Sequence, residues 1–89
     1  MPAENKTVEH GTVKWVHAKS GMTGIALDDG SHVLIEPIGA SGPPVGARLT
    51  GDMRSFGEVA LRCSESDKTW AGFVLAYDLS EDAIALAMR

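Results

Sequence analysis

Cationic and aromatic side chains gather in one short stretch of the sequence, GTVKWVHAKSGMTG, at positions 11–24. Cations bind phosphate oxygens and an indole ring stacks on a base, so these side chains suit a phosphate-bearing ligand. The competing interpretation is that the charges only keep the protein surface hydrated. Arg48 and Arg62 are expected to point outward into the same basic patch. The predicted ligand-binding residues are Lys14, Trp15, His17, Lys19, Ser20 and Arg54.

The sequence lacks the residue patterns that carry catalysis or bind a metal. Histidines occur at positions 10, 17 and 32, but no two of them have the close, same-face spacing of a metal motif. His10 and His17 are seven residues apart, which places them on opposite faces of a strand. The serines of GASG and SEDA lack the strand–turn–helix setting of a nucleophile elbow. We therefore predict that the protein is not an enzyme and has no catalytic or metal-binding residues.

The length and composition predict one small globular domain. A chain of 89 residues is too short for two hydrophobic cores, and 44% hydrophobic with 22% charged residues is typical of a globular protein. We expect a flexible tail over residues 1–7 and a single domain over residues 8–89. The net charge of -4 argues against strong binding to nucleic-acid backbones, which needs clustered Lys and Arg.

The sequence also predicts a cytoplasmic location. No apolar run reaches the roughly 18–20 residues of a membrane span. The polar opening MPAENKTVEHG lacks the apolar core of a signal peptide. We therefore expect a protein that does not insert into a membrane.

Period-two alternation predicts the strands of the first half. In TVKWVHA, Val13, Trp15 and His17 fall on one face, and Lys14 and Val16 fall on the other. The segments 23–27 and 31–36 flank the turn DDGS and are expected to form a hairpin. Together these strands predict an antiparallel meander.

Three more strands are predicted in the second half. ARLTGDM and GEVALRC alternate, with the inward positions Ala47, Leu49, Met53, Val59 and Leu61. Cys63 is the single cysteine, which excludes an intrachain disulfide, and its place on the same face predicts a packed core thiol. The apolar run TWAGFVLAYD is expected to be a central strand covered on both faces, with Gly72 at a bulge or a close backbone approach.

The ending DLSEDAIALAMR predicts a short C-terminal helix. Ser80 is a favourable N-cap, followed by Glu81 and Asp82 in the first turn. Leu79 and Ile84 have the spacing of a hydrophobic staple. The competing interpretation is a strand that alternates with alanines, which are depleted in strands. Six strands and this helix predict a mainly β fold, a small antiparallel β-barrel of about six strands with a short C-terminal helix.

Residues 11–36 resemble the opening of the cold-shock family, small OB barrels that bind nucleic acids. GTVKWVHAKSG is similar to their first strand, and GIALDDGSHVLIE follows at a matching distance. The resemblance implies binding of single-stranded nucleic acid by stacking on aromatic side chains. Of these aromatics only Trp15 is present, because the matching region carries Met22, Thr23, Gly24, His32, Val33 and Leu34. Each lost stacking platform removes about 1–3 kcal/mol, so nucleic-acid binding is the second hypothesis.

Residues 11–89 resemble PilZ domains, bacterial barrels that often act as cyclic di-GMP receptors. The similarity lies in PPVGARL, GEVALRC, the GF-type strand TWAGFVLAYD and DLSED before a terminal helix. HAKSGMTG falls where such domains place a DxSxxG turn, and it offers His17, Lys19 and Ser20. The N-terminal RxxxR motif of ligand-binding members has no counterpart, since no arginine precedes Arg48.

The PilZ resemblance implies a non-enzymatic regulatory binding module with degenerate cyclic di-GMP motifs. Divergent relatives that lack the motifs are thought to work through protein partners. We therefore expect a protein partner, no tightly bound cofactor, and at most weak binding of cyclic di-GMP. A helix packed over the barrel would favour this resemblance, whereas a closing C-terminal strand would favour the cold-shock one.

Overall fold

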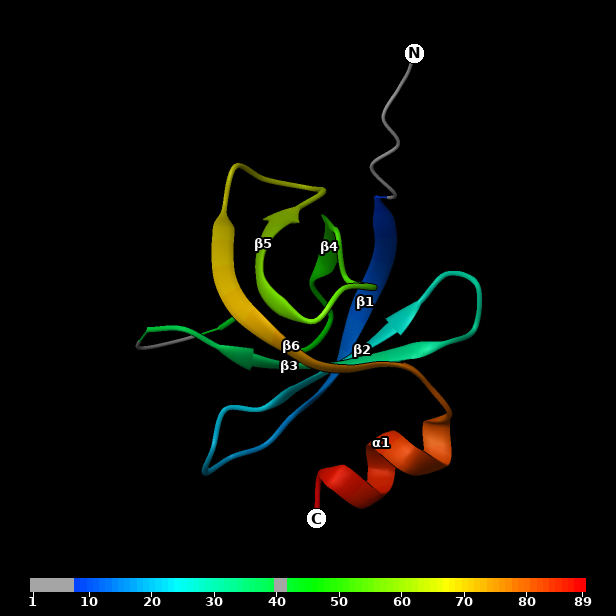
Figure 1. Cartoon of the computed structure of the whole chain (residues 1–89). Coiled ribbons are helices and arrows are strands. Elements are labelled where there is room, and N and C mark those ends of the chain that lie inside the picture. The colour runs from blue at the N-terminus through cyan, green and yellow to red at the C-terminus, as the bar shows by residue number, and fades with distance from the viewer. Residues whose placement is uncertain (1–7, 40–41) are drawn as a thin grey trace.

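Seven elements make up the structure, a computed structural model that describes residues 8–39 and 42–89 (Figure 1). They are β1 (Glu9–Val16), β2 (Thr23–Leu27), β3 (His32–Pro37), β4 (Arg48–Gly51), β5 (Gly57–Cys63), β6 (Thr69–Leu79) and α1 (Glu81–Ala87). The strands form a closed barrel in the order β1-β2-β3-β6-β5-β4, with every pairing antiparallel. The predicted six-strand barrel with a C-terminal helix is therefore confirmed. The tail predicted at residues 1–7 lies outside the described residues.

The core fills the inside of the barrel, where alternate residues of each strand meet. The inward positions predicted at Leu49, Met53, Val59 and Leu61 are confirmed, because all four side chains are buried in one cluster. Burying each side chain of this size contributes about 1.5–3 kcal/mol. A register slip by one residue would move a whole row to the solvent face, so this burial fixes the strand pairing.

A bulge in β1 changes the predicted alternation of the first strand. Val13 pairs with Ile25 and lies in the core, but the register shifts before Trp15, which pairs with Gly24. Gly24 and Ile25 are consecutive residues of β2 and therefore face opposite sides. The prediction that Val13 and Trp15 share a face is thus wrong: the bulge turns Trp15 to the outside of the barrel.

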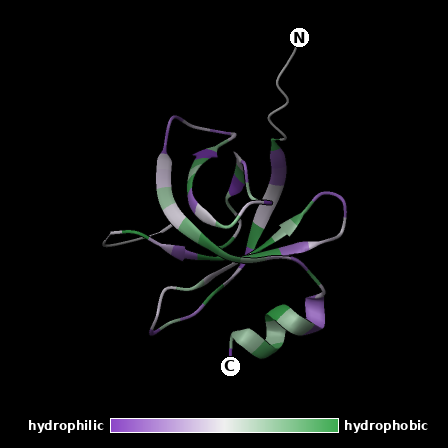
Figure 2. Ribbon diagram, in the orientation of Figure 1, coloured by the Kyte–Doolittle hydropathy of each residue, from purple (hydrophilic) through white to green (hydrophobic). Residues whose placement is uncertain are grey.

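The helix α1 packs against the outside of the barrel wall (Figure 1). The Ser80 side chain accepts a hydrogen bond from the Ala83 amide at 3.1 Å, as the predicted N-cap requires. The helix is polar at its start and apolar beyond it (Figure 2), and Ile84 is 0% exposed. A Cβ atom on Gly24 would lie 3.0 Å from Ile84 Cγ2 and 3.3 Å from Met88 Cε. The predicted helix is therefore confirmed, and a glycine in β2 gives it room to dock.

Strand β6 is covered on one face only. Gly72 and Val74 are buried, but Phe73 is 44% exposed and Leu75 is 41% exposed. The prediction of a strand covered on both faces is therefore wrong, because none of the described residues covers Phe73 and Leu75 on the outer face of β6. The close approach predicted at Gly72 is confirmed, since a Cβ atom there would lie 2.7 Å from Ile35 Cγ2.

Candidate ligand-binding cleft

Most of the predicted ligand-binding residues line one open cleft beside the turn that joins β1 to β2. Lys14, Trp15, His17 and Lys19 line this cleft, which has a volume of about 750 Å³. That volume lies within the range of small-molecule sites. The remaining lining residues are Val16, Ala18, Val45, Met88 and Arg89. The cleft thus joins the first turn of the barrel to the end of α1.

The β1–β2 turn is built around His17. The His17 amide donates to the Met22 carbonyl at 2.8 Å, and the Gly21 amide donates back to the His17 carbonyl at 2.9 Å. The amides of Lys19 and Ser20 both donate to His17 Nδ1, each at 3.2 Å. Nδ1 must therefore be unprotonated, which leaves the proton of a neutral ring on Nε2. The imidazole holds the backbone that presents Lys19.

Ser20 contributes to the same turn and not to the cleft wall. Its Oγ accepts a hydrogen bond from the Met22 amide at 3.2 Å, and it is not among the lining residues. The side chain closes a local turn, as serine hydroxyls often do. Gly21 has a φ of 76°, a left-handed conformation that glycine adopts without strain.

The Trp15 ring is held by α1 on the outer face of the barrel. A Cβ atom on Gly24 would lie 2.9 Å from Trp15 Cε3 and 3.0 Å from Ile84 Cγ2, so both side chains cover the same glycine. The ring centroids of Trp15 and His32 are 5.8 Å apart and tilted by 53°. His32 Nδ1 lies 3.2 Å from the Leu79 carbonyl, just before α1. The indole is therefore positioned by both the sheet and the helix.

The cleft is cationic within a chain of net negative charge. Lys14, Lys19 and Arg89 line it, and none of the three forms an ion pair with another described residue. Free cations beside an indole can bind phosphate oxygens while the ring stacks on a base. The arrangement therefore suits an anionic ligand that carries an aromatic group.

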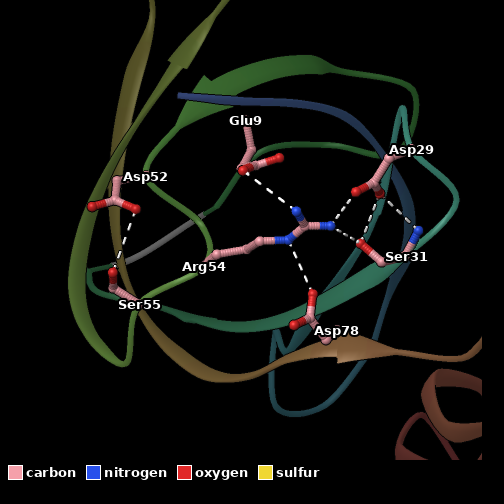
Figure 3. Close-up of polar contacts among 7 residues, drawn as sticks. All are labelled: Glu9, Asp29, Ser31, Asp52, Arg54, Ser55 and Asp78. Atoms are coloured by element: carbon pink, nitrogen blue, oxygen red, sulfur yellow. Dashed lines mark hydrogen bonds and ion pairs between the residues drawn. The ribbon is translucent and has the colours of Figure 1, made fainter. Parts of the chain in front are cut away.

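Arg54 lies apart from the other predicted ligand-binding residues. Its guanidinium contacts Glu9, Asp29 and Asp78, and Nη2 donates to Ser31 Oγ at 2.7 Å (Figure 3). Nε lies 3.0 Å from Asp78 Oδ1, close enough for an ion pair but without the alignment of a hydrogen bond. Three carboxylates already neutralise this cation, and it does not line the cleft. The structure therefore does not bring Arg54 together with the other five residues.

The Ser31 amide and the same arginine lower the pKa of Asp29. Hydrogen bonds from the Ser31 backbone amide and from the Arg54 guanidinium hold the pKa of Asp29 at about 2, below its ordinary value of 3.8. The carboxylate is stabilised in its charged form, which is the form that the ion pair requires.

The other two predicted surface arginines occupy a second wall of the barrel. Arg48 and Arg62 line a cavity of about 680 Å³ together with His10. Arg48 forms a two-pronged ion pair with Asp28, with N···O distances of 2.8 and 3.0 Å. The predicted single basic patch is therefore divided, because Lys14 and Lys19 line a different cleft and Arg54 is paired elsewhere.

Cys63 also lines this second cavity, at the end of β5. It is half-buried, so the prediction of a packed core thiol is wrong. A hydrogen bond from the Ser66 side chain, followed by one from the Glu65 backbone, lowers the pKa of the thiol. The β5–β6 turn that supplies these groups comes directly after Cys63.

Sequence reasoning missed the contribution of Met88 and Arg89 to the cleft. A helix with Ile84 on its buried face indicated that α1 would pack on the barrel, but it did not indicate against which strands. The glycine at position 24 was the available signal, because a small residue on an outer face lets another element approach closely.

Comparison with protein families, curated proteins and solved structures finds no match for this chain. Within residues 8–39 and 42–89, no three His, Cys, Asp or Glu side chains are grouped so that they could hold a metal ion. The same described residues contain no helix that is long and apolar enough to span a membrane.

Proposed function

We propose that the protein is a non-enzymatic, PilZ-like regulatory binding module that holds a cyclic dinucleotide weakly in the cleft and acts through a protein partner. One observation carries the nucleotide part of the proposal: unpaired cations from two distant parts of the chain line the same cleft as Trp15. Lys14 and Lys19 come from β1 and the turn after it, and Arg89 follows α1.

The chemistry of a cyclic dinucleotide complements this set of side chains. Its two phosphates accept hydrogen bonds from ammonium and guanidinium groups, and its bases offer faces to an indole. The PilZ resemblance implies arginines upstream of the barrel, whereas in this protein Arg89 supplies the arginine from the C-terminal side. A ligand in contact with both Lys19 and Arg89 would hold α1 against the barrel, which gives binding a structural output.

A titration with cyclic di-GMP followed by amide chemical shifts tests this proposal. Shifts are expected at residues 14–19 and 88–89. Each exposed lysine contributes roughly 0.5–1 kcal/mol to binding a phosphate, so the double variant Lys14→Ala/Lys19→Ala should bind about five- to thirtyfold more weakly. The variant Arg62→Ala/Lys68→Ala removes the same charge elsewhere and should bind as the parent does. The absence of any shift at millimolar ligand would overturn the nucleotide proposal.

In the cold-shock alternative, nucleic-acid bases would stack on the surface that α1 covers in this structure. Gly24 and Leu34 fall in the region where that resemblance expects stacking aromatics, and Ile84 and Met88 approach within contact of Gly24. Binding of single-stranded nucleic acid stays a prediction. It is tested by quenching of Trp15 fluorescence by oligonucleotides at low salt, in a Trp70→Phe background that leaves one indole. Unchanged emission would count against it.

A further inference from the structure

An exposed apolar strip runs along the outer face of β6 and its neighbours. Phe73 and Leu75 are exposed on β6, and Ile38 is exposed just beyond β3. The Ile38 amide donates to the Ala71 carbonyl at 2.9 Å, which places it beside the same strand. Exposed apolar side chains that adjoin one another mark interaction surfaces more often than scattered ones do.

Two carboxylates flank Phe73 on this surface. Phe73 pairs with Glu36 on β3 and with Glu58 on β5, and paired residues point to the same face of a sheet. The next residues along β6, Gly72 and Val74, are buried. Phe73, Glu36 and Glu58 therefore project together to the outside of the barrel, with the aromatic ring in the middle.

Neither carboxylate has a cation of its own. Among the described residues, Glu36 and Glu58 form no ion pair, and both are exposed. An aromatic ring between two free carboxylates is complementary to a guanidinium or ammonium group. Such a cation stacks on the ring face and binds both carboxylates at once.

We propose that this surface, formed by Glu36, Ile38, Glu58, Phe73 and Leu75 and called the Phe73 face, docks a basic, apolar segment of a partner protein. An arginine or lysine of that segment lies over Phe73 between Glu36 and Glu58, and apolar side chains on either side cover Ile38 and Leu75. The six strands close into a barrel, so we expect the partner to bind through side chains and not by adding a strand.

The proposal for the Phe73 face rests on the proposed function in one respect, that the protein acts through a protein partner. It uses none of the residues that line the nucleotide cleft, so either site can fail alone. The competing occupant is a second copy of this chain, whose Arg48 and Arg62 could supply the cation because they lie on another wall of the barrel. That contact would join unlike surfaces and repeat without closing into a dimer.

Short peptides of defined charge test the proposal. The probes are a peptide that alternates leucine with arginine and a control peptide with glutamate in place of each arginine. The basic peptide should shift the amide signals of residues 36, 58 and 73, and the acidic peptide should not. In the variant Glu36→Lys/Glu58→Lys the preference should reverse, with at least about a tenfold loss of affinity for the basic peptide, because two attractive pairs become repulsive.

Matched variants separate this surface from the general charge of the protein. Glu65→Lys/Asp67→Lys makes the same change of charge in the exposed β5–β6 turn, and it should retain the preference for the basic peptide. Phe73→Ala should weaken the binding of the basic peptide and leave the cyclic di-GMP titration unchanged. Equal loss in both charge-reversal variants, or no shift at residue 73, would overturn the proposal. Concentration-dependent association of the parent that disappears in Glu36→Lys/Glu58→Lys would overturn it in favour of a second copy.

Discussion

His17 has two roles at the residue scale, and they constrain how the cleft can be studied. Its Nδ1 accepts hydrogen bonds from two backbone amides of the β1–β2 turn, and its ring also lines the cleft. A substitution of His17 would therefore loosen the turn and alter the ligand site together. Lys14 and Lys19 are better probes, because both side chains are exposed and none of the hydrogen bonds of the turn depends on them.

Ser80 provides a direct test of the N-cap of α1. The Ser80 side chain accepts a hydrogen bond from the Ala83 amide, which has no acceptor within the helix. Replacing Ser80 with Ala removes this acceptor. The free energy of unfolding should fall by about 0.5–2 kcal/mol, measured by urea denaturation. Ser64→Ala is the control, since Ser64 is exposed and lies in a turn outside the helix. An equal loss in both variants would contradict a capping role.

At the element scale, the sequence predicted the strands and the helix more reliably than their faces. Alternation identified the inward rows of β4 and β5, and capping identified α1, because both signals depend on neighbours in the chain. The bulge before Trp15 inserts one residue into the alternation. The residue types in KWV do not indicate a bulge, so it could not be predicted. The exposure of Phe73 also could not be predicted, since it depends on whether another layer covers β6.

The docking of α1 should depend on Ile84 and not on Leu86. Ile84 is 0% exposed against Gly24, whereas Leu86 is 63% exposed on the same helix. Ile84→Ala should cost about 2–5 kcal/mol of packing and shift the Trp15 emission to longer wavelength as the helix releases the ring. The measurement is fluorescence in a Trp70→Phe background. Leu86→Ala should leave both stability and emission unchanged, and a red shift in that variant would contradict the predicted contact.

At the scale of the whole molecule, Arg54 joins three distant segments of the chain. Its carboxylate partners lie at the start of β1, in the β2–β3 turn and at the end of β6. Asp78 adopts a φ of 57°, a left-handed conformation that aspartate tolerates better than most residues. Such a cluster could not be predicted from the sequence, and neither could the fact that Lys14 and Arg89 line one cleft, because both arrangements arise only when the barrel has closed.

The hydrogen bonds that Asp29 accepts from the Ser31 amide and from Arg54 predict how the barrel responds to acid. The pKa of Asp29 is about 2 in the folded protein and 3.8 in an unperturbed carboxyl, so the unfolded chain binds the proton first as pH falls. The stabilisation from this group is therefore fully present above about pH 4 and is lost progressively as the pH falls through about 2. Unfolding of the parent, followed by circular dichroism, should show stability falling across this window. Asp29→Asn should lower stability near neutral pH and flatten the acid dependence. Asp67→Asn changes an exposed carboxylate that forms no ion pair among the described residues, so it should keep the parent profile. If Asp29→Asn retained the full acid slope, the hydrogen bonds from the Ser31 amide and Arg54 to Asp29 would not be the source of the acid dependence.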